Sequence, residues 1–329
     1  MTPRDVLLLG LLMLTPASGS PTTYTNPVIA HDAPDPGVLR VDDTYYLVTT
    51  GDGPDGAFPL YTSRDLEHWK QMGSALPTRP TWAGGAWWAP ELHQVGGRYL
   101  LYYSAETTAG QHVIGVAQSD QPQGPFQDVG KPLAADPHVG LIDATFFHDT
   151  DGKNYLYWKE DGNAIGQPCR IMAAPLSADG TQVEGSPVPV LENDPKSWEG
   201  TVVEGPELVK RGDWYYLFYS GNGYAGDAYG EGVARSQSPT GPFEKRGHPL
   251  LHSNAAWKGP GHADIVTDPA GENWLLYHAW PAGHVNAPPG RELLLDRLWW
   301  GPDDWPYVQD GAPSTTPQVG PVWRRTPRP

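Results

Sequence analysis

Cysteine and positive charge are both scarce in this sequence of 329 residues. Its single cysteine, Cys169, excludes an internal disulfide, and we interpret it as a small buried side chain rather than a nucleophile. Only 22 lysines and arginines oppose 38 aspartates and glutamates, which gives a net charge of −16. That charge argues against nucleic acid or an anionic membrane as a partner, because both require basic surfaces. A neutral polysaccharide fits better, although acidity alone also serves solubility.

Helical periodicity is also lacking. No long stripe of apolar residues recurs every 3.6 residues, and 39 glycines with 36 prolines interrupt most windows in which a helix could form. The one apolar run of note, residues 6–14, is too short to span a bilayer. Small and polar residues follow it, so the pattern predicts a secretory signal peptide at residues 1–20. We therefore expect a secreted protein, extracellular or periplasmic.

Aromatic residues, by contrast, are abundant and follow a repeat. Tryptophan and tyrosine gather in short runs bounded by turn residues, a pattern typical of buried strands. Five segments begin with Gly or Asp and reach a leucine four residues later: residues 43–47, 97–101, 152–156, 213–217 and 271–275. A repeat of this size, rich in short aromatic strands, is typical of propeller blades of about four strands each.

The repeat predicts an all-β fold, a five-bladed β-propeller that forms a single domain over residues 21–329. A second pattern, Ala-x-Ser-x-x-Pro-x-Gly-Pro-Phe, occurs at residues 117–126 and 234–243 and is interpreted as the outer hairpin of a blade. Residues 22–27 are expected to be extended and to close the ring by joining the last blade. The tail after Gly311 shows no strand pattern and is expected to be irregular.

One position recurs at nearly the same phase in every copy. Counting back 12 or 13 residues from the five leucines reaches Asp35, Trp88, Asp143, Glu204 and His262. A shared phase predicts a shared place in the fold, and the first strand of each propeller blade lines the central channel. These side chains should therefore converge around one axis. Three acids and a histidine in a channel are unfavourable unless they perform chemistry or bind an ion.

Other residues near these positions receive separate interpretations. Trp87 and Trp88 are candidates for a wall on which a sugar ring stacks, with core filling as the alternative. Tyr224, in the glycine-rich loop of residues 221–230, is a further candidate for ligand contact. Glu91 is out of phase by three residues and is taken as structural. Glu207 is expected to point to the opposite face of a regular strand from the recurring acid, so it receives no catalytic role.

Three inward carboxylates beside aromatic side chains suggest glycoside hydrolysis. That reaction needs one acid to protonate the leaving oxygen and a second carboxylate to act as base or nucleophile. A third carboxylate can raise the pKa of the acid by like-charge repulsion. Prolines on both sides of Asp35, and the Gly-Pro pair after Glu204, fix the backbone there, and rigid placement is what a catalytic carboxylate requires.

The motifs, taken in order, resemble glycoside hydrolase family 43. They are Ala-Pro-Asp-Pro around Asp35, Trp-Ala-Pro-Glu at 88–91, Ile-Asp-Ala-Thr-Phe-Phe at 142–147, Val-Glu-Gly-Pro at 203–206 and Gly-His-Ala-Asp at 261–264. The resemblance covers nearly all of residues 21–329. It implies a five-bladed propeller that hydrolyses glycans containing arabinose or xylose with inversion.

The resemblance also implies roles for individual residues. Asp35 is the expected general base that activates water, Glu204 is the expected general acid, and Asp143 is expected to tune and orient that acid. Arg291 matches an arginine that reaches the site from the last blade. His262 is expected in the central channel, where relatives often hold a calcium ion or water. The chemistry should need no cofactor, and a structural calcium at His262 is weighed against a hydrogen-bonded histidine without metal.

These inferences predict a secreted, exo-acting, inverting α-L-arabinofuranosidase, a monomer that acts on arabinan, arabinoxylan or a related glycan. Arabinose is preferred because xylosidases that resemble this sequence usually carry an added C-terminal β-sandwich, whereas the sequence ends after the fifth blade. Within the family, a β-xylosidase and an endo-arabinanase stay open. Outside it, the sequence leaves open a retaining enzyme with Asp35 as nucleophile and a non-catalytic carbohydrate-binding propeller.

Overall fold

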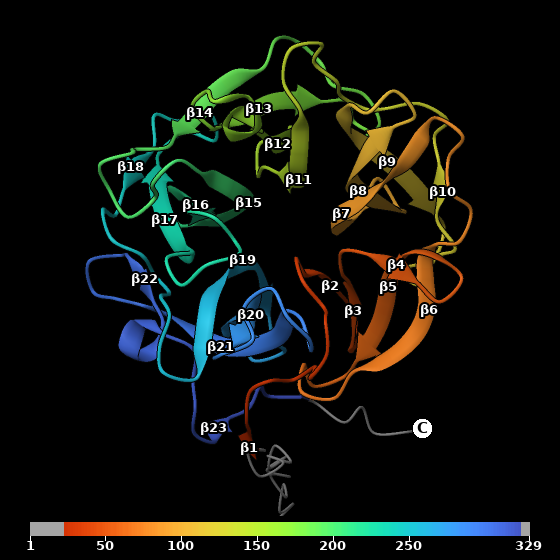
Figure 1. The fold of residues 1–329 in the computed structure, drawn as a ribbon. Helices are drawn as coiled ribbons and strands as arrows, with labels where there is room; N and C mark the ends of the chain where they lie inside the picture. The colour runs from red at the N-terminus through yellow and green to blue at the C-terminus, as the bar shows by residue number, and fades with distance from the viewer. Residues whose placement is uncertain (1–22, 324–329) are drawn as a thin grey trace, which may run out of the picture.

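The computed structural model describes residues 23–323, which are almost entirely β-structure (Figure 1). In this range the chain forms 23 strands and two 3₁₀ helices, η1 (Gly162–Ile165) and η2 (Gln309–Gly311), without an α-helix. The lack of helical periodicity is thereby explained. No helix within residues 23–323 is long and apolar enough to cross a membrane. The signal peptide predicted at residues 1–20 lies outside the described range.

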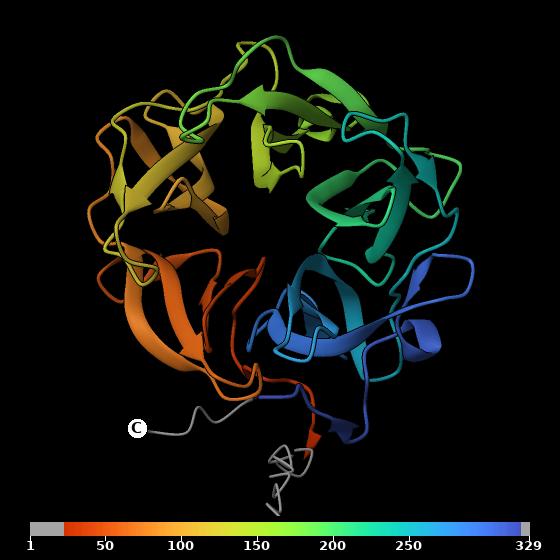
Figure 2. The ribbon, with the colours of Figure 1, turned by 180° about the vertical axis from the view of Figure 1, so that it is seen from behind.

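Five sheets form a ring around one axis, which confirms the five-bladed propeller (Figure 1, Figure 2). The first blade has five strands: β2 (Gly37–Val41), β3 (Thr44–Val48), β4 (Asp52–Gly53), β5 (Gly56–Ser63) and β6 (Lys70–Leu76). The second and third blades are formed by β7 (Ala83–Val95), β8 (Arg98–Thr107), β9 (His112–Ser119) and β10 (Gln127–Asp128), then β11 (Leu141–His148), β12 (Asn154–Glu160), β13 (Arg170–Leu176) and β14 (Val188–Glu192). The fourth and fifth blades are formed by β15 (Val203–Arg211), β16 (Trp214–Gly221), β17 (Gly230–Ser236) and β18 (Glu244–Lys245), then β19 (Trp257–Thr267), β20 (Asn273–Pro281), β21 (Glu292–Trp300) and β22 (Pro306–Tyr307).

The sequence repeat corresponds to the blade. The first strand of each blade lies nearest the centre of the ring, and the repeat leucine lies on the second strand (Figure 1). All five leucines are fully buried: Leu47, Leu101, Leu156, Leu217 and Leu275. Each such side chain contributes about 1.5–3 kcal/mol by leaving water. The regular spacing of this sequence signal therefore reflects the regular spacing of buried second strands.

The hydrophobic core lies between neighbouring blades. One cluster joins Val48 and Phe58 of the first blade to Leu101 and Tyr103 of the second blade. Phe126, the last residue of the predicted outer-hairpin motif, packs into the same cluster and is 1% exposed. Each blade therefore depends on its neighbours for the burial of its faces, which favours a closed ring.

The two ends of the described chain meet beside the last blade. β1 (Thr23–Tyr24) pairs antiparallel with β23 (Gln318–Val319). The Asn26 side chain accepts a hydrogen bond from the Leu295 backbone N–H at 2.8 Å and donates one to the Leu295 carbonyl at 3.0 Å. The expected junction with the last blade is confirmed for residues 23–27, the part of that segment that the structure describes. The tail after Gly311 is irregular as expected, up to residue 323, except for β23, which is too short to leave a sequence pattern.

Near the channel, one position with a left-handed backbone conformation recurs in all five blades, just before β2 in the first blade and on the inner strand in the other four; β7 and β19 carry a second such residue, Ala86 and Gly259. The residues at the recurring position are Asp35 (φ 51°), Ala89 (φ 41°), Asp143 (φ 57°), Gly205 (φ 56°) and His262 (φ 54°). In the second to fifth blades, the pairing with the second strand shifts register at this point. Such a conformation costs about 1–3 kcal/mol for a residue other than glycine. The same strained bulge therefore recurs around the channel, where the predicted site residues lie.

Candidate active site

A cavity of about 470 Å³ collects nearly all of the predicted site residues at the bulges of the inner strands. Every one of them except Trp87 lines it: Asp35, Trp88, Asp143, Glu204, Tyr224, His262 and Arg291. Its volume is within the range of about 300–1,000 Å³ that is typical of small-molecule sites. The three acids come from the first, third and fourth blades, so only the closed ring brings them together.

Trp87 does not belong to the cavity, and its prediction as a sugar-stacking residue is wrong. Its ring is 7% exposed and packs edge-on to Phe58, with 6.1 Å between ring centroids. The Arg79 guanidinium covers it at 5.4 Å. Adjacent side chains of a strand point to opposite faces, so Trp88 faces the cavity while Trp87 fills the core between two blades. Core filling was the alternative that the sequence left open.

The carboxylate of Asp35 is anchored through one oxygen. Its Oδ1 lies 2.8 Å from Arg291 Nη1, 3.2 Å from His278 Nδ1 and 3.5 Å from His262 Nδ1. Its Oδ2 accepts no hydrogen bond from the described residues and is available to a water molecule. Burial by itself raises the pKa of Asp35, but the neighbouring cation and imidazoles outweigh burial and hold the pKa well below its ordinary value. The group is therefore ionised at neutral pH.

Both oxygens of Glu204 are held by side chains. Lys159 donates to Oε2 at 2.9 Å, and the Tyr229 hydroxyl donates to Oε1 at 2.9 Å. Asp143 is held next to it, because its Oδ2 accepts the backbone N–H of Gly205 at 3.1 Å. The acid and its expected modulator therefore meet at one peptide, which connects the inner strands of two neighbouring blades.

The pKa values of Asp143 and Glu204 are shifted in opposite directions. Burial, with the like charges of Glu204 and Asp35, raises the pKa of Asp143 to about 6, although His262 and Lys159 act in the other direction. Burial also acts to raise the pKa of Glu204, but the Lys159 ammonium outweighs it and lowers that pKa. The two groups are neighbours, so a proton that they hold belongs to the pair.

His262 lies between the acids. Its ring packs against Gly205, where an added β-carbon would lie 3.1 Å from the imidazole, so that position disfavours a side chain. Within residues 23–323, no group of three or more His, Cys, Asp or Glu side chains has the geometry of a metal site. Calcium normally takes six to eight oxygen ligands, which these residues do not supply alone. The calcium at His262 stays a prediction, and no step of the proposed chemistry uses it.

Aromatic side chains and an arginine form the rest of the wall. Trp88 is 38% exposed, and its ring lies 4.6 Å from that of His112. Tyr224 is 47% exposed and lies 4.9 Å from the Arg291 guanidinium. The Trp280 indole donates to the Tyr224 carbonyl at 2.9 Å, which holds the loop in place. Two exposed aromatic rings beside carboxylates are what a sugar ligand needs for stacking.

The family model for glycosyl hydrolases family 43 matches residues 24–306, a range that contains every acid of this cavity. The chain belongs to family 43. It is therefore a glycoside hydrolase by family, and the matched range agrees with the propeller described above.

Several relatives of this family 43 chain act on different sugars. It is 30% identical to a non-reducing end alpha-L-arabinofuranosidase of Bacteroides ovatus, over 94% of this chain and 58% of the relative. It is 29% identical to a xylan 1,3-beta-xylosidase of Vibrio sp, over 88% of this chain and 58% of the relative. The chain thus spans somewhat over half the length of these two relatives. A thermostable family-43 glycoside hydrolase superposes with a TM-score of 0.82 at 31% identity, covering 92% of this chain and all of that structure.

Four further cavity residues with polar side chains escaped the sequence reasoning for this family 43 chain. Lys159, Asp161 and Asn163 line the cavity beside Glu204, and Thr50 lines it beside Asp35. Lys159 and Thr50 both lie three residues after a repeat leucine, so counting forward along the repeat would have found them. Asp161 and Asn163 lie beyond the repeat motif, and the sequence gives no signal for them.

A second layer of acids lies in the channel outside the cavity. Glu207 is not on the opposite face of a regular strand, because the bulge shifts the register, and it accepts a hydrogen bond from Thr145 at 2.7 Å. Burial and the charge of Asp264 raise its pKa well above the ordinary value. Burial and the same charge raise the pKa of Glu91 well above its ordinary value. Neither acid lines the cavity.

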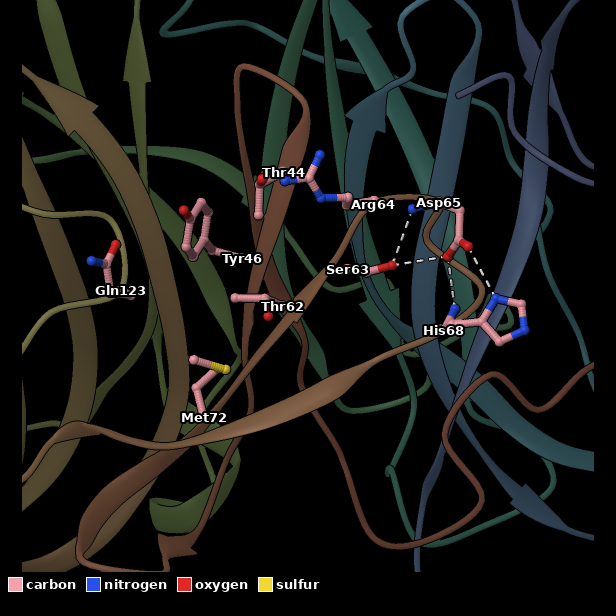
Figure 3. A pocket seen from close by; sticks show the side chains of 9 residues that line it. All are labelled: Thr44, Tyr46, Thr62, Ser63, Arg64, Asp65, His68, Met72 and Gln123. Atoms are coloured by element: carbon pink, nitrogen blue, oxygen red, sulfur yellow. Dashed lines mark hydrogen bonds and ion pairs between the residues drawn. The ribbon is translucent and has the colours of Figure 1, made fainter. Parts of the chain in front are cut away.

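The other large cavity, of about 570 Å³, lies at the end of the first blade opposite to Asp35. Figure 3 shows the side chains that line it. Asp35 precedes β2, whereas Thr44 of this cavity begins β3. Ser63, the last residue of β5, pairs with the adjacent Tyr45. Its acid, Asp65, is used locally: it accepts the Ser63 hydroxyl at 3.0 Å and the His68 backbone N–H at 2.8 Å (Figure 3). The predicted chemistry therefore has one location in the described chain.

Proposed function

We propose that this chain is a secreted, exo-acting α-L-arabinofuranosidase that works as a monomer on arabinan, arabinoxylan or a related glycan by single displacement. The observation that carries the proposal is the convergence of Asp35, Asp143 and Glu204 in one cavity with exposed aromatic walls. Hydrolysis with inversion needs a base for water on one side of the sugar and an acid for the leaving oxygen on the other.

Asp35 is the proposed general base. The Arg291 guanidinium donates to Oδ1 and is the main group that keeps Asp35 ionised, which leaves Oδ2 for the attacking water. In the reaction, Oδ2 takes a proton from water while the water oxygen bonds to the anomeric carbon. Holding the base and water in one geometry lowers the entropic barrier of the step.

Glu204 is the proposed general acid, and Asp143 is the proposed modulator of its proton affinity. The glycosidic oxygen leaves with the proton of Glu204, and solvent then reprotonates the pair. Because burial and like charges raise the pKa of Asp143 to about 6, we expect the pair to lose its proton, and the enzyme its activity, as the pH rises through about 6. This expected pH dependence belongs to the pair and not to Glu204 alone. Burial acts to raise the pKa of Glu204, but the Lys159 ammonium outweighs burial and lowers it.

The sugar is assigned by the relatives rather than by the cavity. The Bacteroides ovatus relative supports a non-reducing end arabinofuranosyl unit. The Vibrio relative, at nearly the same identity, makes β-xylosidase activity the second candidate. Trp88 and Tyr224 can stack on a pentose ring of either kind.

Product analysis tests the proposal. The wild type, Glu204→Gln and a control, Glu244→Gln, are incubated with linear arabinan, arabinoxylan and xylo-oligosaccharides, and the products are separated. We expect arabinose monomer from the wild type and the control, whose side chain is 66% exposed. Loss of a general acid lowers turnover by about 10²–10⁴-fold, so Glu204→Gln should release almost none.

The remaining outcomes are also decisive. A ladder of arabino-oligosaccharides would replace the proposed function with that of an endo-arabinanase, and xylose alone would replace it with that of a β-xylosidase. Release of no sugar from any substrate would leave a carbohydrate-binding propeller as the function to test. Equal turnover by Glu204→Gln and the wild type would contradict the role of Glu204.

A further inference from the structure

Four of the five blades share one contact to the next blade. The side chain three residues after the repeat leucine accepts the backbone N–H of the residue at the recurring left-handed position in the next blade. The pairs are Thr50 to Ala89 (2.7 Å), Ser104 to Asp143 (2.8 Å), Ser220 to His262 (2.7 Å) and His278 to Asp35 (3.2 Å). Burial lowers the pKa of His278 to about 4, so its Nδ1 can accept like the hydroxyls. The contact therefore supports the strained bulges around the ring.

The third blade breaks this rule at Lys159. An ammonium group has no lone pair to accept a hydrogen bond, and the backbone N–H of Gly205 instead donates to Asp143 Oδ2 at 3.1 Å. Lys159 Nζ contacts Glu204 Oε2 at 2.9 Å and Asp161 Oδ1 at 2.8 Å. The exchange of an acceptor for a donor thus occurs at the one blade junction that holds the proposed acid.

Burial shows that this lysine is not a surface residue that happens to reach an acid. Its side chain is only 2% exposed, and removing an ammonium from water is unfavourable unless it is paired. Threonine and serine satisfy the same position in other blades without a charge. The fold therefore does not require lysine here, and a role for its charge explains its presence.

We propose that Lys159 is a positioning residue that fixes the carboxyl group of Glu204 and sets the pH range in which Glu204 holds its proton. The ammonium stabilises the carboxylate that remains after Glu204 gives its proton to the leaving oxygen, so it makes Glu204 a stronger acid. The same attraction makes Glu204 lose its proton at lower pH. The effect on hydrolysis rests on the proposed function, whereas the effect on titration does not.

Other charged and titratable groups around Glu204 act with or against Lys159. They come from several elements: Asp161 after β12, Asp143 on β11, His262 on β19, Tyr229 before β17, and Asp35 with Arg291 at the far wall of the cavity. Asp161 partly neutralises Lys159, so its removal should strengthen the effect of the lysine on Glu204. Lys159→Met and Asp161→Asn should therefore shift the titration of Glu204 in opposite directions.

The titration can be measured without substrate. In protein labelled with ¹³C at the glutamate carboxyl, the Glu204 signal is assigned by its loss in Glu204→Gln and followed against pH. Nearby opposite charges shift a carboxyl pKa by about one to three units, so Lys159→Met should raise the midpoint by that order. Asp161→Asn should lower the midpoint, and Lys159→Arg should keep it near the wild-type value.

The pH dependence of kcat/KM gives the second readout, because it reports the titration of the free enzyme. The alkaline limb should move to higher pH in Lys159→Met and to lower pH in Asp161→Asn. Lys210→Met is the matched control, since it removes an ion pair of 2.7 Å to Asp149 at the other end of the strand that carries Glu204. The alkaline limb of kcat/KM in Lys210→Met should coincide with that of the wild type.

The outcomes separate the two proposals. An unchanged Glu204 midpoint in folded Lys159→Met, or an equal shift in Lys210→Met, would overturn the role of Lys159 even if the wild type hydrolyses arabinan. If Lys159→Met does not fold, the role is tested by Asp161→Asn alone. A shift of its Glu204 midpoint and of its alkaline limb to higher pH would overturn the role of Lys159. If the Glu204 midpoint shifts in Lys159→Met but the wild type releases no sugar, the electrostatic role of Lys159 is supported and the hydrolase function is rejected.

Discussion

At the residue scale, the two oxygens of Asp35 have different surroundings. All of its charged and imidazole neighbours approach Oδ1, and Oδ2 faces the cavity without a hydrogen bond from the described residues. The Arg291 guanidinium, at 2.8 Å, is the closest of these neighbours. It immediately precedes β21, the third strand of the last blade, so ring closure determines the ionisation of the first blade's acid.

Removal of this arginine should narrow the pH range of activity on the acid side. Burial raises the pKa of Asp35 and Arg291 is the main group that lowers it, so Arg291→Ala should raise that pKa. The base must be ionised, and the acid limb of kcat/KM should therefore move to higher pH by about one to three units. Arg291→Lys keeps the charge and should shift less. An acid limb that stays in place in Arg291→Ala would contradict the assignment of Asp35 as base.

At this scale, the sequence predicts a residue correctly where its position within the repeat determines whether its side chain points into the channel. Asp35, Asp143 and Glu204 were found because the repeat fixes which residues turn into the channel. Trp87 was assigned wrongly because adjacent aromatic residues look alike in sequence, and only strand alternation together with the bulge separates it from Trp88. The pairing of Tyr229 with Glu204 has no sequence signal, because the two residues lie 25 positions apart in the fourth blade.

At the scale of the element, the recurring bulge is the device that builds the site. The fourth blade uses Gly205 at its left-handed position, which leaves the neighbouring Glu204 free to carry the carboxyl group. The other acidic blades place the acid itself in the strained conformation, at Asp35 and Asp143. Because the glycine has no side chain, the ring of His262 can lie against it.

Gly205→Ala should therefore destabilise the fold more than a matched glycine substitution. Gly212 has nearly the same φ, 59° against 56°, but a β-carbon there meets nothing within 4 Å. Gly212→Ala should lose about 1–2 kcal/mol from left-handed strain alone. Gly205→Ala adds a contact of 3.1 Å with His262 and should lose more, together with activity. Equal free energies of unfolding in urea for the two variants would contradict this account of the bulge.

The sequence predicts which positions take part in the interblade contacts, but not which of them form hydrogen bonds. Counting back along the repeat found the inner-strand residues, and counting forward by three residues reaches Thr50, Ser104, Lys159, Ser220 and His278. Which of these accept an N–H from the next blade depends on the ring geometry, which the sequence does not display. The departure at Lys159 becomes meaningful only when the other four contacts are seen together.

At the scale of the whole molecule, the ring is closed by contacts between the N-terminal segment and the last blade. Asn26 makes hydrogen bonds to the backbone of Leu295 at both 2.8 and 3.0 Å and also reaches Ser314 at 3.0 Å. The sequence predicted the blade count from the spacing of aromatic strands. It could not predict the pairing of β1 with β23, because two-residue strands far apart in the chain carry no periodicity.

Asn26→Ala should weaken the whole ring. Loss of these partly buried hydrogen bonds should lower the free energy of unfolding by about 1–3 kcal/mol. Asn273→Ala is the control, because its side chain bonds only to Thr267 and Trp300 within the fifth blade. We expect a smaller loss there in urea unfolding followed by tryptophan fluorescence. A smaller loss in Asn26→Ala than in Asn273→Ala would contradict closure through Asn26.

The central claim is that carboxylates from three blades carry out single displacement in one cavity. The most direct test is ¹H NMR of the first sugar released from the best substrate, recorded before mutarotation, with Glu204→Gln as the inactive control. Single displacement predicts that the anomeric configuration is inverted, which for an α-L-arabinofuranoside means β-L-arabinofuranose. Retention of configuration would contradict the claim, because the product would then come from a covalent intermediate with Asp35 as the nucleophile.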